Sequence, residues 1–193
     1  NNFMVSGAAN TAGMFAAKYP GSRGNDLKIS VFAASATSGN TAAWNAWPYR
    51  NLFQRKPDTS DFVLKSTGGS RLFDEMHIVV IDTKGTITGT ANTVLEKFQG
   101  VSKCKNARNA DGSSNYYADV LQGRSAWLYA INHAQNVTSQ VKETITWGNT
   151  LSQMATANVT TGDLEWITPY QQTYYTYTVS TKNGMSDIPT AGN

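Results

Sequence analysis

An unbroken run of β-branched residues, with no polar position inside it, lies near the middle of the chain. It spans residues 78–81, and Asp82 follows it directly. A run of this kind is typical of a strand whose two faces are both covered, because a half-exposed strand alternates apolar with polar side chains. The pattern therefore predicts a central buried strand over residues 74–82.

The residues after this strand predict a hairpin. Asp82 can accept hydrogen bonds from the backbone ahead of it, and Gly85 is free to take positive φ. We expect residues 86–88 to form the returning strand. Residues 93–98 are also expected to be extended, although residues 95–98 fit a helical turn equally well.

A helix and a further strand are expected after a polar loop. The apolar positions of residues 116–121 fall on one helical face, with Ser114 placed to cap its start and Gly123 to end it. Residues 126–131 form a second apolar run, whose length favours a buried strand over a helix. Strand, hairpin, helix and strand in this order indicate an α/β unit.

Upstream of the central strand, residues 27–32 alternate apolar with polar, which predicts a strand with one buried face. The small residues of 8–17 fit a short helix or an irregular packed segment, and residues 19–22 fit a turn. Residues 36–70 are the least regular region but are rich in aromatic side chains. Because so many aromatics argue against disorder, we expect an insertion that packs through Trp44, Trp47, Tyr49 and Phe53.

Downstream, two further segments have the pattern of strands. Residues 141–147 place apolar and polar side chains on opposite sides, and residues 171–179 are strongly β-prone. In the second segment Tyr175, Tyr177 and Val179 share a face. The sequence does not decide where these late strands are placed.

Composition adds that the surface is polar but weakly charged. The chain has 193 residues, of which 40% are hydrophobic, so it can bury a core as one domain or part of one. Its charged fraction of 15% is low beside the roughly 25% usual for soluble domains. Such a surface suits packing against copies of the same chain, and an ordinary β-rich domain with long loops fits it equally well.

The net charge of +3 does not point to nucleic acid. A nucleic-acid site needs a focused basic stripe with stacking aromatics, and none is evident. The densest basic cluster is expected to be a solvated loop; it comprises Lys97, Lys103, Lys105 and Arg108. No apolar run approaches the roughly 18 residues of a membrane span, and we expect no secretory leader. Without a leader, the glycosylation patterns at Asn136 and Asn158 mean little.

Reactive and metal-binding residues are few. Cys104 is a single cysteine, which rules out an internal disulfide; the lysines beside it could favour the thiolate, but no histidine base pairs with it, so we expect a bystander thiol. Two distant histidines and one cysteine match no metal-ligand spacing. No phosphate or dinucleotide motif accompanies the glycines. We therefore expect no catalytic residue, no metal and no cofactor.

Two blocks of sequence, in order along the chain, resemble the tail sheath protein of contractile-tailed bacteriophages. Together they cover roughly half of the chain. The blocks are Ala16-Ala17-Lys18-Tyr19-Pro20-Gly21-Ser22-Arg23-Gly24-Asn25-Asp26-Leu27-Lys28-Ile29-Ser30-Val31 and, further on, Asp74-Glu75-Met76-His77-Ile78-Val79-Val80-Ile81-Asp82 with Thr88-Gly89-Thr90, Thr93-Val94-Leu95-Glu96-Lys97-Phe98, Val101-Ser102-Lys103 and Asp111-Gly112-Ser113-Ser114-Asn115-Tyr116-Tyr117-Ala118-Asp119-Val120.

The resemblance implies an α/β fold, with a mixed sheet, flanking helices and long loops, similar to the central subtilisin-like domain of sheath proteins. Residues 1–193 would be an internal portion of a longer subunit. Within it, residues 8–35 and 74–135 would form the α/β core, residues 36–73 an aromatic-rich insertion, and residues 136–193 a β-rich segment of uncertain placement. In such a family the late strands either rejoin the sheet or reach an adjacent subunit.

The function that the resemblance implies is structural. The chain would belong to a virion protein that polymerises as stacked rings around the tail tube and contracts to drive genome delivery into the host. Its partners would be identical sheath subunits, the tail tube protein, the baseplate and the tail terminator, with no direct nucleic-acid contact. It would be located in the virion tail after assembly in the host cytoplasm.

Two alternatives come from other functional classes. A carbohydrate- or receptor-binding virion module would use the Trp and Tyr residues. A subtilisin-like hydrolase would use Asp82, whose strand resembles the one that carries the catalytic aspartate in that family. However, the family's histidine is followed by glycine and its serine lies in Gly-Thr-Ser, whereas His77 precedes Ile78, His133 precedes Ala134 and no Gly-Thr-Ser occurs. Lys84 also stands where the protease pattern has glycine. We therefore expect no enzyme.

Overall fold

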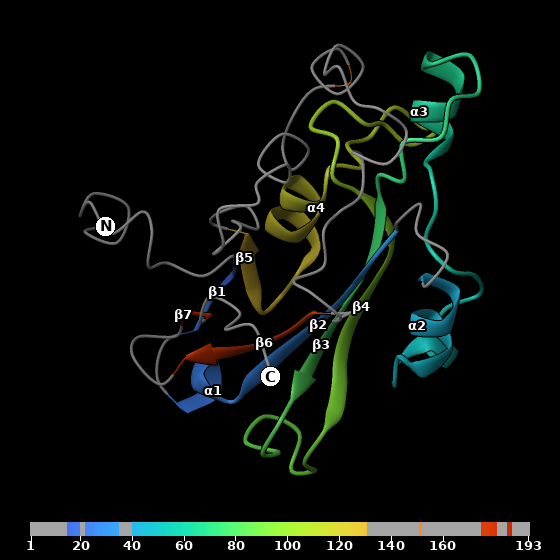
Figure 1. The fold of residues 1–193 in the computed structure, drawn as a ribbon. Coiled ribbons are helices and arrows are strands. Elements are labelled where there is room, and N and C mark those ends of the chain that lie inside the picture. The colour runs from blue at the N-terminus through green and yellow to red at the C-terminus, as the bar shows by residue number, and fades with distance from the viewer. Residues whose placement is uncertain are drawn as a thin grey trace, which may run out of the picture.

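A seven-stranded sheet organises the chain (Figure 1). The computed structural model describes residues 15–19, 22–34, 40–130, 151, 175–180 and 185–186. The strand order is β4-β3-β2-β6-β7-β1-β5. The elements are β1 (Phe15–Ala17), α1 (Ser22–Asn25), β2 (Leu27–Ala33), α2 (Asn40–Ala46), the 3₁₀ helix η2 (Arg50–Leu52), α3 (Asp61–Ser66), β3 (Glu75–Asp82), β4 (Thr93–Ser102), α4 (Tyr117–Arg124), β5 (Leu128–Ala130), β6 (Tyr175–Ser180) and β7 (Met185–Ser186).

Every pair of neighbouring named strands is antiparallel. A sheet accompanied by helices is consistent with the expected α/β class, but the expected mixture of parallel and antiparallel strands is not found among the described ones. Few helices accompany the sheet, and the described part of the chain has none that is long and apolar enough to cross a membrane.

Strand β3 is buried along its whole length, as predicted, but it is the second strand from one edge of the sheet and not its central one. It pairs with β2 on one side and β4 on the other, from Leu27↔Asp82 to Ala33↔Met76 in the β2 ladder. The prediction of one wet face for β2 is wrong, because only Lys28 is partly exposed along it. Both faces of this part of the sheet are covered, which is why β3 carries no alternation.

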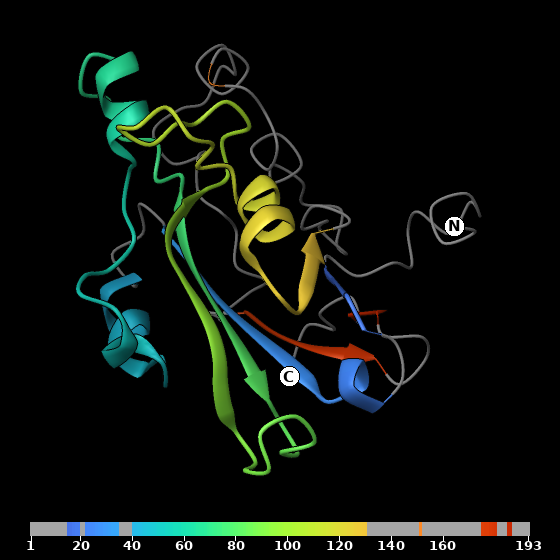
Figure 2. The same cartoon turned by 180° about the vertical axis from the view of Figure 1, so that it is seen from behind.

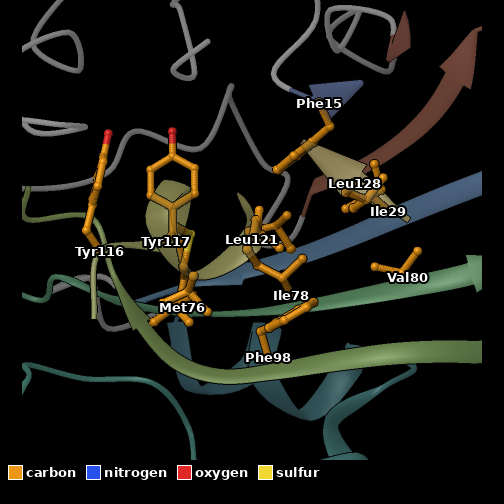
Figure 3. Close-up of a cluster of buried hydrophobic side chains, with 14 of the residues drawn as sticks. Phe15, Ile29, Met76, Ile78, Val80, Phe98, Tyr116, Tyr117, Leu121 and Leu128 are labelled. Carbon is orange, nitrogen blue, oxygen red and sulfur yellow. The ribbon is translucent and has the colours of Figure 1, made fainter. Parts of the chain in front are cut away.

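One face of the β4-β3-β2 part of the sheet packs against α4 and against β5, the strand at the other end of the same sheet (Figure 3). Side chains that point to this face are Ile29, Ile78, Val80 and Phe98, and they meet Leu121 from α4. These positions alternate along each strand with those of the other face, as strand geometry requires. This cluster is the larger part of the apolar core.

The opposite face is covered by the segment that contains α2 and η2 (Figure 2). Trp47 and Phe53 are buried there against Phe32, Val79 and Ile81. The Trp47 and Phe53 rings are stacked, with their centroids 5.4 Å apart. The expectation that residues 36–70 pack through their aromatics is confirmed for these two side chains.

Several local predictions need correction. Residues 86–88 are not a strand: they belong to a loop, and the returning strand is β4. Residues 15–17, expected to be helical or irregular, form β1, and α1 begins where the turn at 19–22 was expected to end. The helix α4 exists but starts at Tyr117, with Tyr116 as its N-cap.

The two cap residues predicted for α4 have other roles. Ser114 bonds to the Asp119 carboxylate and accepts from the Tyr116 amide, rather than capping the first turn. Gly123 lies inside the helix, which ends at Arg124 with Ser125 as its C-cap. Of the apolar run predicted as a strand, residues 126–130 are described, and among these only β5 is a strand, where Tyr129 is 44% exposed.

Of the late strands, residues 175–180 are confirmed as β6. This strand pairs with β2 of the same chain, for example Ile29↔Tyr177, so it rejoins the sheet. The predicted strand at 141–147 lies outside the described residues, as do His133, Asn136 and Asn158.

Candidate functional site

The polar residues of β3 and its two ends are the candidates for chemistry. His77 and Asp82 lie on this one strand, five residues apart. At about 3.3 Å per residue their backbones are separated by about 16 Å, and because side chains alternate they point to opposite faces. The structure therefore does not bring together the aspartate and the nearest histidine that a catalytic triad would need.

Asp82 organises the loop that follows β3. Its Oδ1 accepts the Gly85 amide (2.9 Å), and its Oδ2 accepts the Ile87 amide (2.9 Å), the Thr88 amide (2.8 Å) and the Thr88 hydroxyl (3.0 Å). Burial of this carboxylate acts to raise its pKa, but these hydrogen bonds outweigh burial and hold the pKa below its usual value. The predicted turn role of Asp82 is confirmed, although the loop is wider than a hairpin turn.

Gly85 is required at its place in this loop. It has φ +79°, and a Cβ there would lie 2.8 Å from the Thr90 carbonyl carbon. Next to it, Lys84 forms an ion pair with Asp26 (2.8 Å), which also accepts the Thr86 hydroxyl. The Lys84 and Thr86 contacts lower the pKa of Asp26. Both carboxylates at this end of the sheet are thus bound by the protein itself.

We expect Asp82→Asn to lower the free energy of unfolding by about 1–3 kcal/mol, because a neutral amide is a weaker acceptor for the loop amides. The difference between the variant and the parent chain should shrink in acid. Since the folded pKa of Asp82 lies below the ordinary 3.8, its contribution is present above that value and is lost as the pH falls through the lowered pKa. Urea denaturation at several pH values measures both effects.

At the other end of the sheet, Glu75 and Arg55 form a two-bond ion pair. The guanidinium nitrogens lie 2.6 and 2.7 Å from the carboxylate oxygens, and Glu75 also accepts the Asp58 amide. The hydrogen bond with Glu75 raises the pKa of Arg55. His77, two residues along β3, is buried and bonds through its ring to Arg55 and Gly100. Burial lowers the pKa of His77, so the ring is neutral at pH 7.

A fully buried polar cluster surrounds Asp74. Its carboxylate accepts the Ser60 amide and hydroxyl, both at 2.8 Å, and the Ser102 hydroxyl. Lys103 is also completely buried, and its ammonium donates to the carbonyls of Phe73 (3.0 Å) and Ala34 (3.3 Å). The prediction that Lys103 belongs to a solvated loop is wrong. Lys97, Lys105 and Arg108 are exposed as expected.

Sequence reasoning missed this cluster. Ser60 could have been found, because it caps α3 and a serine three residues before Val63 is a helix-start signal. Nothing local distinguishes Lys103 from its exposed neighbour Lys105. The partners of Lys103 come from distant parts of the chain, and no periodicity indicates them.

Cys104 lies at the edge of the same cluster and is buried. Burial raises the pKa of its thiol to about 11. The neighbouring lysines therefore do not favour the thiolate, contrary to the electrostatic suggestion in the sequence. Its Sγ lies 3.0 Å from Asn106 Oδ1.

We expect iodoacetamide at pH 8 to alkylate Cys104 about 100-fold more slowly in the folded chain than in denaturant. The reason is that a thiol of pKa near 11 has a far smaller thiolate fraction than a free cysteine. Mass spectrometry of timed samples measures the rate. Equal rates in the two conditions would contradict the burial of this thiol.

Within the described ranges, no group of three or more His, Cys, Asp or Glu side chains could hold a metal ion. The polar residues described above bind one another and the backbone, and their arrangement fixes loops and segments to the sheet.

A comparison with known proteins finds a phage protein that is similar to part of this chain. A stretch of 80 residues is 32% identical to a protein of Salmonella phage ViI. That relative is a tail sheath protein. The match covers 42% of this chain and 9% of the sheath protein, so the chain spans less than a tenth of its relative's length. No family profile matches the chain, and no solved structure matches it.

Proposed function

We propose that this chain is part of a contractile tail sheath subunit of a bacteriophage. The observation that carries the proposal is the 32% identity over 80 residues to the phage ViI tail sheath protein. The subunit would polymerise with identical copies around the tail tube, between the baseplate and the tail terminator, and contract to deliver the genome. It would assemble in the host cytoplasm and remain in the virion.

The rigidity of the described part of the chain supports a mechanical role. A contractile array stores free energy in contacts between subunits that are weaker in the extended lattice than in the contracted one. Each subunit must then transmit force without deforming. The doubly covered strand β3, with polar clusters bound at both of its ends, provides such rigidity.

We also propose that the chain has no catalytic centre. Asp82 holds a loop, His77 has both ring nitrogens bonded to the backbone, and Cys104 is a buried thiol of raised pKa. A subtilisin-like central domain is a further part of the proposal. Its test is a solved structure of the complete subunit, whose central domain should superpose on the subtilisin fold.

Negative-stain microscopy of the complete gene product tests the assembly proposal. We expect tubes or striated sleeves, because heterologous contacts between identical subunits build open helical polymers. Dispersed monomers under every condition that supports virion assembly would contradict the proposal. Labelling of the protein at a site other than the outer sleeve of a phage tail would contradict it as well.

One observation favours a carbohydrate- or receptor-binding module as the second candidate. Tyr19 and Tyr129 are 52% and 44% exposed, and Trp127 packs edge-on against Tyr19 with ring centroids 5.5 Å apart. Exposed aromatic rings are the surfaces on which sugars stack. This candidate predicts a monomer or closed trimer that binds a glycan array, and Tyr129→Ala would abolish the binding.

A further inference from the structure

His77 lies opposite an irregularity in the neighbouring strand. The β3–β4 register passes from Met76↔Val101 to Ile78↔Phe98, so that two residues of β4 face His77 alone. One of them is Gly100, with φ +64°, the left-handed conformation that a bulge of this kind uses. The bulge turns the Gly100 amide toward the imidazole, and its nitrogen lies 3.0 Å from Nδ1.

The other ring nitrogen reaches the segment on the far side. Nε2 of His77 lies 2.8 Å from the carbonyl oxygen of Arg55. A carbonyl can only accept, so Nε2 must carry a proton; an amide can only donate, so Nδ1 must carry none. The two backbone partners thus specify the neutral ring in one tautomer, with both nitrogens satisfied.

The ring also packs within the aromatic cluster of the same segment. It stacks on Phe53, with centroids 4.3 Å apart and planes 16° apart, and meets Trp44 edge-on at 5.7 Å. Phe53 in turn stacks on Trp47. His77 is therefore the residue where β3, the β4 bulge and the segment of residues 40–57 are joined.

We propose that His77 is a proton-operated latch, which holds residues 40–57 on the sheet while its ring is neutral and releases them when the ring is protonated. If Nδ1 were protonated, its N–H would point at the N–H of the Gly100 amide, and neither of these two donors could accept a hydrogen bond. The hydrogen bond would be replaced by a repulsive contact in a buried site. The proposal does not depend on the sheath function.

The charges around the ring do not offset this effect. Glu75 on β3 is bound to Arg55 of the packed segment, so the attraction of the carboxylate for an imidazolium is opposed by the guanidinium. Lys97 of β4 adds a positive charge, with its ammonium on the Leu52 carbonyl. The remaining titratable groups on β3 and on the elements that face it are Asp82 on β3, Glu96 on β4, Lys28 on β2, and Tyr49, Arg50, Lys56 and Asp58 on the packed segment and just after it; α2 carries none.

The direction of the pH dependence follows. In the open form the ring is solvated and has an ordinary pKa near 6.5, whereas burial lowers the pKa in the closed form. As the pH falls below 6.5, the open form binds a proton that the closed form does not. The ratio of open to closed form should therefore rise by up to about tenfold per pH unit, until the lowered pKa is reached.

An NMR titration of the ¹⁵N-labelled chain tests the latch. Near neutral pH the His77 ring should show the proton on Nε2. On acidification, ring protonation should coincide with changes at the Gly100 amide and at the Trp44 and Trp47 indoles, while α4 signals stay unchanged. Protonation of His77 with no change at Gly100 or the two indoles would overturn the proposal.

Two variants separate the latch from general acid unfolding. His77→Gln removes the titrating ring and should abolish the step in the indole signals, whereas His133→Gln, the matched control, should retain it. An unchanged step in His77→Gln would also overturn the proposal. If His77→Gln does not fold, the titration of the parent chain and of His133→Gln still decides the question.

Discussion

Replacing Asp74 by alanine is expected to lower the free energy of unfolding by about 3–5 kcal/mol. The substitution leaves the Ser60 amide and the hydroxyls of Ser60 and Ser102 without their acceptor in a site that is fully buried. Each unsatisfied buried donor costs about 1–3 kcal/mol of stability, and the two hydroxyls can reduce this cost by rotating toward other acceptors. Because small domains are stable by only about 5–15 kcal/mol, the variant should lie close to unfolding, as urea denaturation would show.

Two further substitutions control this result. Asp74→Asn keeps one acceptor oxygen of the same shape and should lose less stability than Asp74→Ala. Asp111→Asn removes a carboxylate that accepts the Ser113 amide and hydroxyl in an exposed turn, and it should shift the denaturation midpoint much less than Asp74→Ala. Similar midpoints for the Asp74→Ala and Asp111→Asn variants would contradict the assigned role of the buried cluster.

Trp47→Ala should destabilise the fold by a similar amount, about 3–5 kcal/mol. Trp47 is 1% exposed, stacks on Phe53 and packs 5.5 Å from Phe32, so truncation leaves a large cavity between the sheet and the segment that covers it. Its indole also donates to the Ser30 hydroxyl (2.8 Å), which is itself buried. Thermal or urea unfolding measures the loss.

The matched control is Trp47→Phe. It keeps an aromatic ring in the cluster and removes the indole donor, so it should cost about 1–2 kcal/mol. If Trp47→Ala were no worse than Trp47→Phe, the packing of residues 40–57 on the sheet would not contribute as we infer.

The strands of the core were predictable because local pattern and tertiary environment agree. The apolar run of residues 78–81 is buried on both faces, and residues 93–98 are extended, as their sequence indicates. The alternation of residues 27–32 predicted the strand but not its second covered face. That cover comes from Trp47 and Phe53, which a local window cannot place.

The loop after β3 was mispredicted for an identifiable reason. The Thr-Ile-Thr sequence at residues 86–88 has high β propensity, but the Asp82 carboxylate binds the amides of Ile87 and Thr88 and holds them in a turn. Side-chain hydrogen bonding therefore outweighed propensity. In the same way, the Ser114 hydroxyl donates a hydrogen bond to the Asp119 carboxylate instead of capping the first turn of the helix.

Some polar candidate residues could be identified from the sequence, but their protonation states could not. Asp82 and His77 were recognisable candidates, yet the tautomer of His77 depends on Arg55 and Gly100, which lie on different segments. The same holds for Cys104: its neighbouring lysines could favour the thiolate, although a bystander thiol was expected, and burial raises its pKa to about 11. Burial and distant partners determine protonation, and neither can be read from a local motif.

The pairing of β2 with β6 has a consequence for biosynthesis. The ribosome delivers Leu27–Ala33 and Glu75–Asp82 long before Tyr175–Ser180, so a nascent chain has one side of β2 without its ladder partner until residue 180 has emerged. An open strand edge invites pairing with other chains. Products of premature termination before Tyr175 should therefore aggregate in the cell, and chaperones that bind the emerging chain would protect this edge.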